Sequence, residues 1–419
     1  MGLLSVFLNT GEKKGMLSKE WAISLESRIT TQLSIGFLNE ESIVLGTASG
    51  KVYAINAQGK IKWQFAVVRT LSKEEQFFRE NSSSAAIKST PIVADIDNNG
   101  KGEVIFGSDE GILYALDCNG KIIWSFKAEG PILGSPYVFD VNNDGKPEIL
   151  FGSTGGFFYI LSSSGRLLSQ FKSSSDIESQ PIVIKDTPMQ ILQILFGTND
   201  GTIYSIDSKC RKIWEFKTPN KITAQPAVGK LYGDEKDFIV IGSQDNKLYA
   251  LTSGGELHWA YSSEGKIFSR AVLADFNKDK KMEIAFGSCD DKIHMLSARG
   301  KKMWDYETNF WVVAPPIAED FDGDGDIEIA AGSYDNFLYI LEAKGRYVID
   351  YMPGIAGITS QPEHYTELVT SEPGNYNGSV LSKAKINGMI LSQGVLNKDK
   401  SIVVASDLGG IYKLKYKLV

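Results

Sequence analysis

Four short segments of the chain carry oxygen-bearing side chains at their first, third, fifth and ninth positions. When a loop curls, side chains at alternate positions converge on one point, and hard divalent cations require oxygen ligands of this kind. The candidate ligands are Asp95, Asp97, Asn99 and Glu103; Asp140, Asn142, Asp144 and Glu148; Asp275, Asn277, Asp279 and Glu283; and Asp320, Asp322, Asp324 and Glu328. The pattern predicts up to four structural calcium sites. The segment that begins at Asp275 is the least suited, because Lys280 stands where the others have a turn-forming glycine.

The alternative reading of these segments is that Asp, Asn and Gly are simply good turn formers. Against it, the oxygen-bearing positions are kept in all four copies, whereas the corresponding regions elsewhere contain Lys185, Lys230 and Asn397. The spacing resembles the calcium loops of FG-GAP repeats in integrin-type propellers. It ends at the ninth position, not at the twelfth as in an EF-hand. The resemblance implies hairpin loops that bind calcium.

These segments belong to a repeat with a period of 45 residues. A Gly-Ser/Thr phrase followed by an apolar, Tyr-rich run recurs at Gly46, Gly107, Gly152, Gly197, Gly242, Gly287, Gly332 and, in degenerate form, Ala405. Each copy contains short β-rich runs separated by Gly, Asn and Asp turns, as in residues 91–126. Such a period is typical of a β-propeller with one four-stranded blade per repeat. We therefore expect an all-β, eight-bladed propeller.

The two ends of the chain predict how the ring closes. The last copy contains only three strands, and the phrase at 15–23 resembles the outer-strand phrase at 120–126. We expect residues 19–25 to pair with the C-terminal blade, which removes exposed sheet edges. The whole chain, 1–419, then forms a single propeller domain. Insertions at about 67–88 and 354–385 interrupt the connections from the first to the second blade and from the seventh to the eighth.

Six tryptophans follow the repeat and are expected to pack between blades, because a buried indole brings a large apolar area. They are Trp21, Trp63, Trp124, Trp214, Trp259 and Trp304, with Ser169 and Ile349 in the other two blades. Trp311 departs from the repeat and follows Phe310 in the connection between the sixth and seventh blades. No packing rule of the repeat requires an aromatic residue there, so these two residues are candidates for contact with a partner.

A wider resemblance lies in phrases such as 53–63 and 114–124, which combine Tyr-Ala, Gly and Trp at a fixed spacing. They are similar to the repeat of propellers of the pyrroloquinoline-quinone (PQQ) type, and the similarity extends over essentially the whole chain. That superfamily includes quinoprotein dehydrogenases and non-catalytic eight-bladed scaffolds, such as the lipoprotein of the bacterial outer-membrane assembly machine. The motif describes how blades pack, so it does not choose between these functions.

The cysteines and histidines of the sequence do not form a pattern typical of an enzyme. A quinoprotein dehydrogenase is expected to have an adjacent cysteine pair, whereas Cys118, Cys210 and Cys289 lie in different repeats. The chain has three histidines, and two of them, His258 and His294, fall in predicted strands. This pattern gives no support to a histidine-rich metal site or a hydrolase triad. We expect a non-enzymatic protein without bound PQQ, and the alternatives are a small-molecule or carbohydrate-binding propeller or a quinone-dependent oxidoreductase.

The insertions favour a recognition module. Both leave an outer strand for the next inner strand, so both emerge on one face, beside the channel and near Trp311. Long loops in compact folds are usually functional or disordered. The functional reading assigns partner contact to Phe77 and Phe78 as well as to Phe310 and Trp311. The other reading takes the insertions as tolerated surface excursions.

Composition limits the partners and the compartment. A net charge of −7 and a pI near 5.3 argue against nucleic-acid binding, which needs a clustered basic surface. No run reaches the roughly 18 apolar residues that span a bilayer. The N-terminus lacks the features of a secretory signal, so the expected location is cytoplasmic if Met1 is native and extracytoplasmic if a leader was removed.

Overall fold

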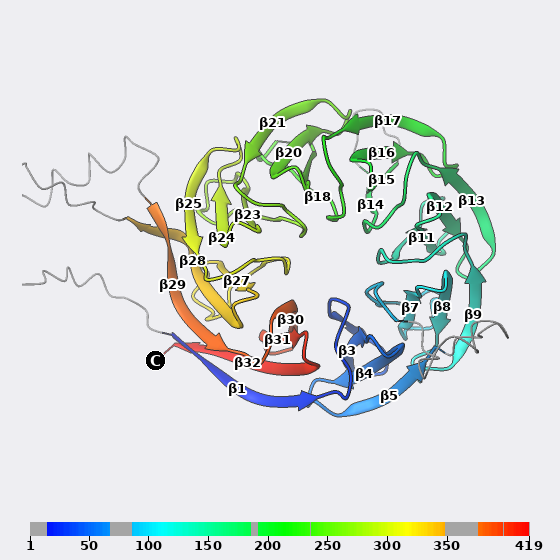
Figure 1. The fold of residues 1–419 in the computed structure, drawn as a ribbon, viewed down its shortest axis with the longest axis horizontal. Coiled ribbons are helices and arrows are strands. Elements are labelled where there is room, and N and C mark those ends of the chain that lie inside the picture. Colours follow the sequence, from blue (N-terminus) through cyan, green and yellow to red (C-terminus); the bar gives the residue numbers. More distant parts are fainter. Residues whose placement is uncertain are drawn as a thin grey trace, which may run out of the picture.

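The structure is a computed structural model that describes residues 15–67, 86–185, 192–234, 236–347, 376–396 and 398–418. These residues form strands and turns and contain no helix. Eight blades of four antiparallel strands stand around a central axis, each with its first strand innermost and its last strand on the circumference (Figure 1). The prediction of an all-β, eight-bladed propeller is confirmed.

The strands fall into four concentric sets. The innermost strands are β2 (Ser34–Phe37), β6 (Ile92–Ala94), β10 (Tyr137–Phe139), β14 (Ile182–Ile184), β18 (Ala227–Gly229), β22 (Val272–Ala274), β26 (Ile317–Glu319) and β30 (Ile390–Leu396). The second strands are β3 (Glu41–Gly46), β7 (Glu103–Gly107), β11 (Glu148–Gly152), β15 (Gln193–Gly197), β19 (Phe238–Gly242), β23 (Glu283–Gly287), β27 (Glu328–Gly332) and β31 (Ser401–Ser406). The third strands are β4 (Lys51–Asn56), β8 (Ile112–Leu116), β12 (Phe157–Leu161), β16 (Thr202–Ile206), β20 (Lys247–Thr252), β24 (Lys292–Leu296), β28 (Phe337–Tyr347) and β32 (Gly410–Leu418). The outer strands are β5 (Ile61–Ala66), β9 (Ile122–Lys127), β13 (Leu167–Lys172), β17 (Lys212–Lys217), β21 (Leu257–Ser262), β25 (Lys302–Glu307), β29 (Tyr376–Lys385) and β1 (Gly15–Ser24).

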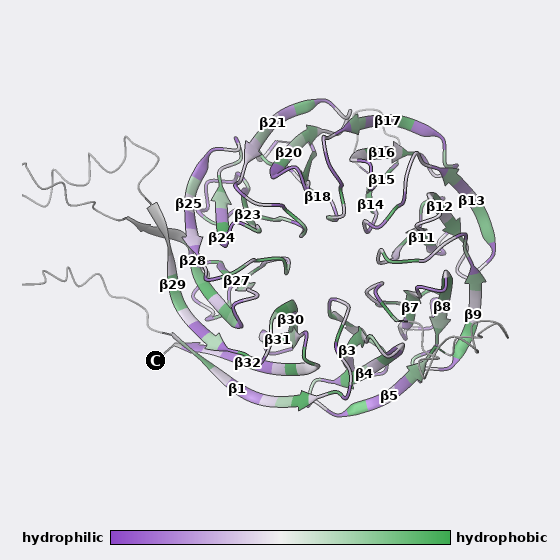
Figure 2. Ribbon diagram, viewed as in Figure 1, coloured by the Kyte–Doolittle hydropathy of each residue, from purple (hydrophilic) through white to green (hydrophobic). Residues whose placement is uncertain are grey.

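The hydrophobic core lies between neighbouring blades. The second strands are buried along their length, as β7 and β11 show, because blades cover both of their faces. One core cluster joins Ile105 and Leu113 of the second blade to Ile149 and Phe151 of the third. The outer strands instead alternate between exposed and half-buried residues, and their ribbons change between hydrophilic and hydrophobic colours (Figure 2). Each blade therefore depends on its neighbours for its core.

The ring closes through the two ends of the chain. Strand β1 pairs antiparallel with β32, from Gly15 opposite Leu418 to Ser24 opposite Gly410. The eighth blade therefore has the strand order β30, β31, β32, β1. The predicted pairing of residues near 19–25 with the C-terminal blade is confirmed, and it removes the open edges that an unclosed array would present.

The six repeat tryptophans join neighbouring blades, as predicted. Each indole Nε1 donates a hydrogen bond of 2.8–3.1 Å to a carbonyl oxygen of the next blade. The donor and acceptor residues are Trp21 and Ala57, Trp63 and Cys118, Trp124 and Ser163, Trp214 and Ser253, Trp259 and Ala298, and Trp304 and Ala343. The ring of Trp63 lies against Gly120, where a Cβ would stand 2.7 Å from the indole. This close approach explains the glycine of the repeated phrase.

Between the third and fourth blades a different pair takes this place. Ser169 replaces the tryptophan, and Cys210, with a φ of 60°, replaces the glycine. The two side chains share a hydrogen bond, and burial raises the pKa of the Cys210 thiol to about 11. Cys210 is larger than the repeat glycine and therefore compensates for Ser169, which is smaller than the repeat tryptophan. The Cys210 thiol thus has a packing role.

The seventh blade corrects one prediction. The repeat predicts an outer strand with Ile349 at the tryptophan position, followed by an insertion at 354–385 before the eighth blade. Instead, β28 continues to Tyr347, and β29 (Tyr376–Lys385) returns along it as the outer strand. Residues 376–385 are thus part of the blade, and residues 348–375 connect its third and fourth strands. Ile349 and residues 354–375 lie outside the described residues, as do residues 68–85 of the other predicted insertion.

Candidate functional sites

The four acidic segments form hairpins between the first and second strands of the second, third, sixth and seventh blades. Their fourth residues, Asn98, Asn143, Lys278 and Gly323, and their sixth residues, Gly100, Gly145, Lys280 and Gly325, all have φ between 59° and 86°. Two left-handed residues curl each loop around its oxygen-bearing side chains. Lys280 adopts this conformation with a φ of 69°, so the loss of glycine in the sixth blade preserves the shape of the loop.

The first aspartate of each hairpin is fixed by the backbone. In the Asp95 hairpin, the amides of Asn99 and Gly100 donate to the two carboxylate oxygens over 3.0 and 2.8 Å. Equivalent bonds hold Asp140 and Asp275, whereas at Asp320 the donors are the amides of the fourth and sixth loop residues, Gly323 and Gly325. These backbone bonds fix the position of the carboxylate in each loop.

The ninth residue is a glutamate at the start of the second strand, and it is buried in all four hairpins. Glu103, Glu148, Glu283 and Glu328 are 2–4% exposed. One carboxylate oxygen of each accepts a hydrogen bond of 2.9–3.0 Å from the backbone amide of the second loop residue. Burial, together with the neighbouring aspartates, raises the pKa of all four, to about 7 for Glu283 and Glu328. An ionised glutamate there needs a positive partner.

Two hairpins bring three carboxylates together. Oxygen atoms of Asp95, Asp97 and Glu103 lie within 4.8 Å of one another, and the same holds for Asp320, Asp322 and Glu328. Three convergent carboxylates with a buried member are a donor set that suits calcium. Asn99 and Asp324 are the oxygen-bearing residues at the fifth positions of these two loops.

The other two hairpins have asparagine at the third position. The Asn142 amide nitrogen donates to Asp144 over 3.1 Å and to Glu148 over 2.8 Å, and Asn277 donates to Glu283 over 3.1 Å. In the sixth blade, the ammonium of Lys281 also contacts Asp279 at 3.3 Å. Protein donors therefore already meet these carboxylates, which makes both hairpins less suited to a cation than the Asp95 and Asp320 hairpins.

Neighbouring acidic hairpins touch. The side-chain amide of Asn98 donates to the Gly145 carbonyl over 3.0 Å, which joins the second and third blades. Lys278 forms an ion pair of 2.7 Å with Asp326, which joins the sixth and seventh. The hairpins thus form two connected pairs. In the fourth and fifth blades, Gln193 and Phe238 take the place of the glutamate.

An aromatic cluster lies on the opposite face of the ring. Phe310 and Trp311, in the connection between β25 and β26, are 43% and 42% exposed, and their ring centroids are 5.2 Å apart with an interplanar angle of 17°. Tyr334, in the hairpin between β27 and β28, stands with its centroid 6.5 Å from both. The structure thus brings the two predicted partner-binding residues together and adds Tyr334, whose position in the repeat gave no separate signal. Phe77 and Phe78 lie outside the described residues.

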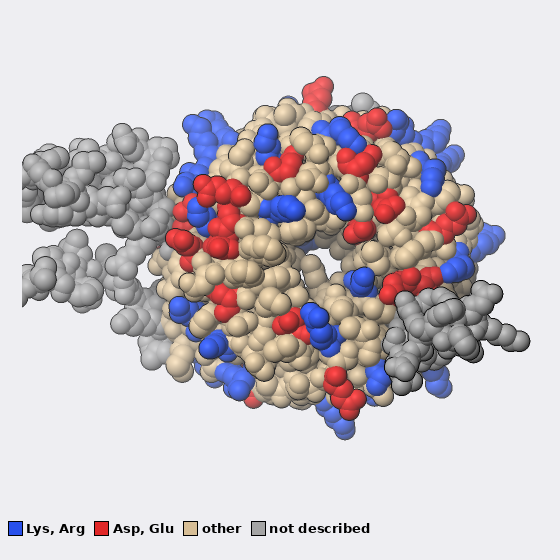
Figure 3. Space-filling model, in the orientation of Figure 1, with Lys and Arg blue, Asp and Glu red and all other residues tan. Residues whose placement is uncertain are grey.

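The residues that line the central channel were not identified from the sequence. A cavity of about 570 Å³ lies at the centre of the ring, and the opening is visible in Figure 3. Seven blades contribute one residue that precedes the inner strand, and the eighth contributes a residue from within β30: Gln32, Thr90, Ser135, Gln180, Gln225, Arg270, Pro315 and Gln393. Six of them recur every 45 residues, directly before the repeat prolines or Ala271. This recurrence every 45 residues could have identified the channel-lining positions from the sequence.

Comparisons with known proteins agree with this architecture. The lambda-carrageenase β-propeller domain matches residues 66–175 and 190–272, just under half of the chain. The structure of BamB from Moraxella catarrhalis has a TM-score of 0.63 and 16% identity, and the match covers 95% of this chain and 99% of that one. No curated protein matches the sequence.

Two structures of BBS1N in complex with ARL6DN, soaked with lead and with mercury, have TM-scores of 0.51 and 0.52 and identities of 14% and 12%. Each match covers 79% of this chain and 93% or 92% of that one. At such identities the likeness establishes the fold alone. Among the described residues, no helix has the length and apolar character needed to cross a membrane.

Proposed function

We propose that this chain is a non-enzymatic protein-recognition propeller, with a partner-binding face around the aromatic cluster and with structural calcium in its acidic hairpins. The observation that carries the proposal is the exposure of Phe310 and Trp311 on one stacked surface beside Tyr334. Aromatic residues dominate binding energy at protein interfaces. Phe310 and Trp311 are about half exposed, whereas aromatic side chains such as Phe106 are buried between blades.

The surroundings of the histidines and cysteines favour recognition over catalysis. His258 shares a 2.8 Å hydrogen bond with the hydroxyl of Tyr232, and His294 is buried against Asp290 and stacked on Phe286. The cysteines are free thiols in three different blades. Among the described residues, the side-chain hydrogen bonds of these histidines go to Tyr232 and Asp290 and not to a cysteine thiol that could act as a nucleophile. The BBS1N propeller in complex with ARL6DN gives a precedent for protein binding by this fold.

The calcium part of the proposal rests on the Asp95 and Asp320 hairpins. A cation bound by these carboxylates would stabilise the ionised forms of Glu103 and Glu328, which burial disfavours. Residues Asp95, Asp97, Asn99 and Glu103 would hold one ion, and Asp320, Asp322, Asp324 and Glu328 another. Such ions would stabilise the hairpins by mass action, without a part in chemistry.

A capture experiment with three matched proteins tests the recognition function. The wild type, Phe310→Ala/Trp311→Ala and the control Ile122→Ala/Ile123→Ala are immobilised and exposed to extract from the source cells. The control removes a comparable exposed apolar pair, at 53% and 48%, from outer strand β9. Any protein retained by the wild type is then purified and its affinity for all three proteins measured.

We expect the purified partner to bind the wild type and the control equally. Loss of a hot-spot pair should weaken binding to the aromatic variant by roughly 30-fold or more, since hot spots contribute about 2 kcal/mol or more. Equal binding to all three proteins would contradict the proposal, as would an equal loss in the control. The melting temperature of each variant shows whether it is folded.

A carbohydrate-binding function is the second candidate, and the match to the lambda-carrageenase propeller favours it. Stacked aromatic rings such as Phe310 and Trp311 can also receive the apolar face of a sugar. Titration with lambda-carrageenan, followed by tryptophan fluorescence, tests this reading. Saturable binding that Trp311→Ala removes and Ile123→Ala preserves would support it, and an unchanged spectrum would count against it.

A further inference from the structure

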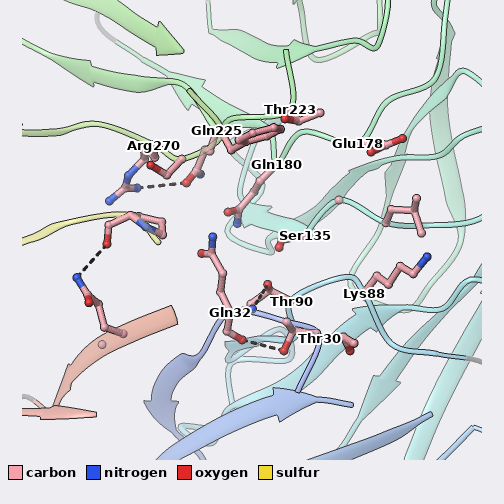
Figure 4. A pocket seen from close by; sticks show the side chains of 18 of the residues that line it. Thr30, Gln32, Lys88, Thr90, Ser135, Glu178, Gln180, Thr223, Gln225 and Arg270 are labelled. Atoms are coloured by element: carbon pink, nitrogen blue, oxygen red, sulfur yellow. Dashed lines mark hydrogen bonds between the residues drawn. The ribbon is translucent and has the colours of Figure 1, made fainter. Parts of the chain in front are cut away.

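The residues that line the central cavity form two layers. The layer described above contains Gln32, Thr90, Ser135, Gln180, Gln225, Arg270, Pro315 and Gln393. Two residues earlier in the sequence, six of the eight blades contribute a second layer: Thr30, Lys88, Leu133, Glu178, Thr223 and Phe268. Its four polar members are labelled in Figure 4. The cavity of about 570 Å³ falls within the range of small-molecule sites, roughly 300–1,000 Å³. Most of its wall is polar.

The glutamines of the first layer mainly connect blades. The amide nitrogen of Gln180 donates to the Pro136 carbonyl over 3.0 Å, and that of Gln393 donates to the Pro315 carbonyl over 3.3 Å. Gln225 makes a longer bond of 3.5 Å to Pro181. These amides satisfy backbone acceptors at the entry of the inner strands, so their first role is structural.

Arg270 breaks this pattern. Its Nη1 donates to the Oε1 atom of Gln225 over 3.3 Å, and within the described residues it forms no ion pair with a carboxylate. The side chain retains access to water in the channel and lies at the cavity wall beside Gln225 (Figure 4). A guanidinium has five donors in a planar fork that matches carboxylate and sulfate oxygens. Most of these donors remain available to a ligand.

The charge of the wall favours an anion. Its cations are Arg270 and Lys88, and its one carboxylate, Glu178, accepts a 2.6 Å hydrogen bond from Asn199. Arg270 and Glu178 lie on different sides of the cavity (Figure 4). A cleft with excess charge of one sign and low-dielectric walls concentrates ligands of the opposite sign.

Neutral polar side chains line other parts of the wall. The side-chain amide of Gln32 extends into the cavity (Figure 4) and makes no hydrogen bond with another described residue. The hydroxyl groups of Ser135, Thr90 and Thr30 belong to the same wall. Such groups exchange hydrogen bonds with ligand hydroxyls.

We propose that the central channel binds a small polyhydroxylated anion of the sugar-acid class. The Arg270 guanidinium holds the carboxylate, and Gln32, Ser135 and Thr90 contact the hydroxyl groups. This site is separate from the aromatic cluster and from the acidic hairpins, and it does not depend on the partner-binding function.

Calorimetry with D-glucuronate as the probe, D-glucose as the neutral analogue and three proteins tests this proposal. The proteins are the wild type, Arg270→Gln and the control Arg166→Gln, which alters an exposed arginine between β12 and β13. Glutamine occupies the place of Arg270 in the fourth and fifth blades, so the first variant retains a residue that this position accepts.

We expect glucuronate to bind the wild type and Arg166→Gln with a Kd below about 10 mM. Arg270→Gln should weaken it at least tenfold, as loss of a charge-assisted pair implies, and glucose should bind at least tenfold more weakly than glucuronate. The proposal fails if glucuronate shows no saturable binding to the wild type, if glucose binds as tightly, or if Arg270→Gln binds glucuronate like the wild type. A melting curve of Arg270→Gln confirms that the variant is folded.

Discussion

The two faces of the ring present different groups, with clustered acidic side chains on one and exposed aromatic rings on the other. On one face, the buried Glu328 lies among aspartates, and burial together with these carboxylates raises its pKa to about 7. On the other, Phe310 and Trp311 leave apolar surface in water. Both kinds of loop are built on the same repeated blade. The comparison teaches that a regular scaffold separates two kinds of loop, because hairpins between the first and second strands leave at one face and connections between blades leave at the other.

Chelation of calcium is expected to produce the largest change that separates the faces. At a calcium concentration about 100 times the Kd, each bound ion stabilises the fold by about 2.7 kcal/mol. The melting temperature should therefore fall on addition of a chelator and recover with excess calcium, whereas partner binding through the aromatic cluster of the folded protein should persist. An identical melting curve with the chelator and with excess calcium would show that the acidic hairpins do not bind a stabilising ion.

Glu328→Gln should remove the contribution of one hairpin. The amide keeps the shape of the carboxylate but supplies one oxygen ligand in place of two, so this site should lose most of its calcium affinity. We expect part of the calcium-dependent rise in melting temperature to disappear, up to about 2.7 kcal/mol. Calcium titration followed by thermal unfolding measures the effect.

Gln193→Glu is the matched control for that change. It places a carboxylate at the equivalent position of the fourth blade, where Gln193 accepts hydrogen bonds from Ser205 and Trp214 and the hairpin lacks the acidic pattern. It should not add a calcium response. A gain in calcium response in Gln193→Glu, or an unchanged response in Glu328→Gln, would show that the hairpin carboxylates do not form the site.

In the absence of calcium, the pH dependence of the free energy of unfolding tests the raised pKa values of the hairpin glutamates. Glu283 and Glu328 have a pKa of about 7 in the fold, against an ordinary value of 4.5. Between these values the folded state binds more protons than the unfolded state, so the free energy of unfolding should fall as the pH rises from about 4.5 to about 7. Denaturant unfolding across this window measures the slope. Saturating calcium should reduce the decline by the contribution of Glu328, because the Asp320 hairpin suits the ion better than the Asp275 hairpin. A decline of equal size with and without calcium would contradict the assignment.

Lys280→Gly should have the smallest effect. Lys280 adopts a left-handed conformation that costs a non-glycine residue roughly 1–2 kcal/mol, and its removal also takes one positive charge from the Asp275 hairpin. We expect a stability gain of about 1 kcal/mol and tighter calcium binding at this hairpin. Lys278→Gly is a comparison at the neighbouring left-handed position, where the Asp326 ion pair is lost as well. A loss of stability in Lys280→Gly would argue against strain at this residue.

Much of the scaffold could be predicted from the sequence, because the repeat places the same residue types in the same packing environment. The tryptophan positions predicted contacts between blades, and the incomplete last repeat predicted the pairing of β1 with β32. The seventh blade escaped prediction because the chain near Gly345 resembles a turn, yet β28 continues and pairs with a strand that follows a long connection. Local sequence does not determine which later segment supplies a missing edge partner.

The sites were predictable to different extents. The acidic hairpins are local, so their spacing showed which side chains could converge, although it did not show that the Asn142 amide meets Glu148. The aromatic pair stood out as a departure from the repeat, while its contact with Tyr334 depends on the next blade. The ring around Arg270 escaped notice because its members are 45 residues apart and differ in type.

Hydrogen–deuterium exchange of the propeller, alone and with its purified partner, tests the recognition function most directly. We predict that the partner slows exchange in the connection between β25 and β26 and in the hairpin between β27 and β28, which carry the aromatic cluster, and leaves the acidic hairpins unchanged. Protection confined to the acidic hairpins or to the outer strands, with the aromatic cluster unaffected, would contradict the account.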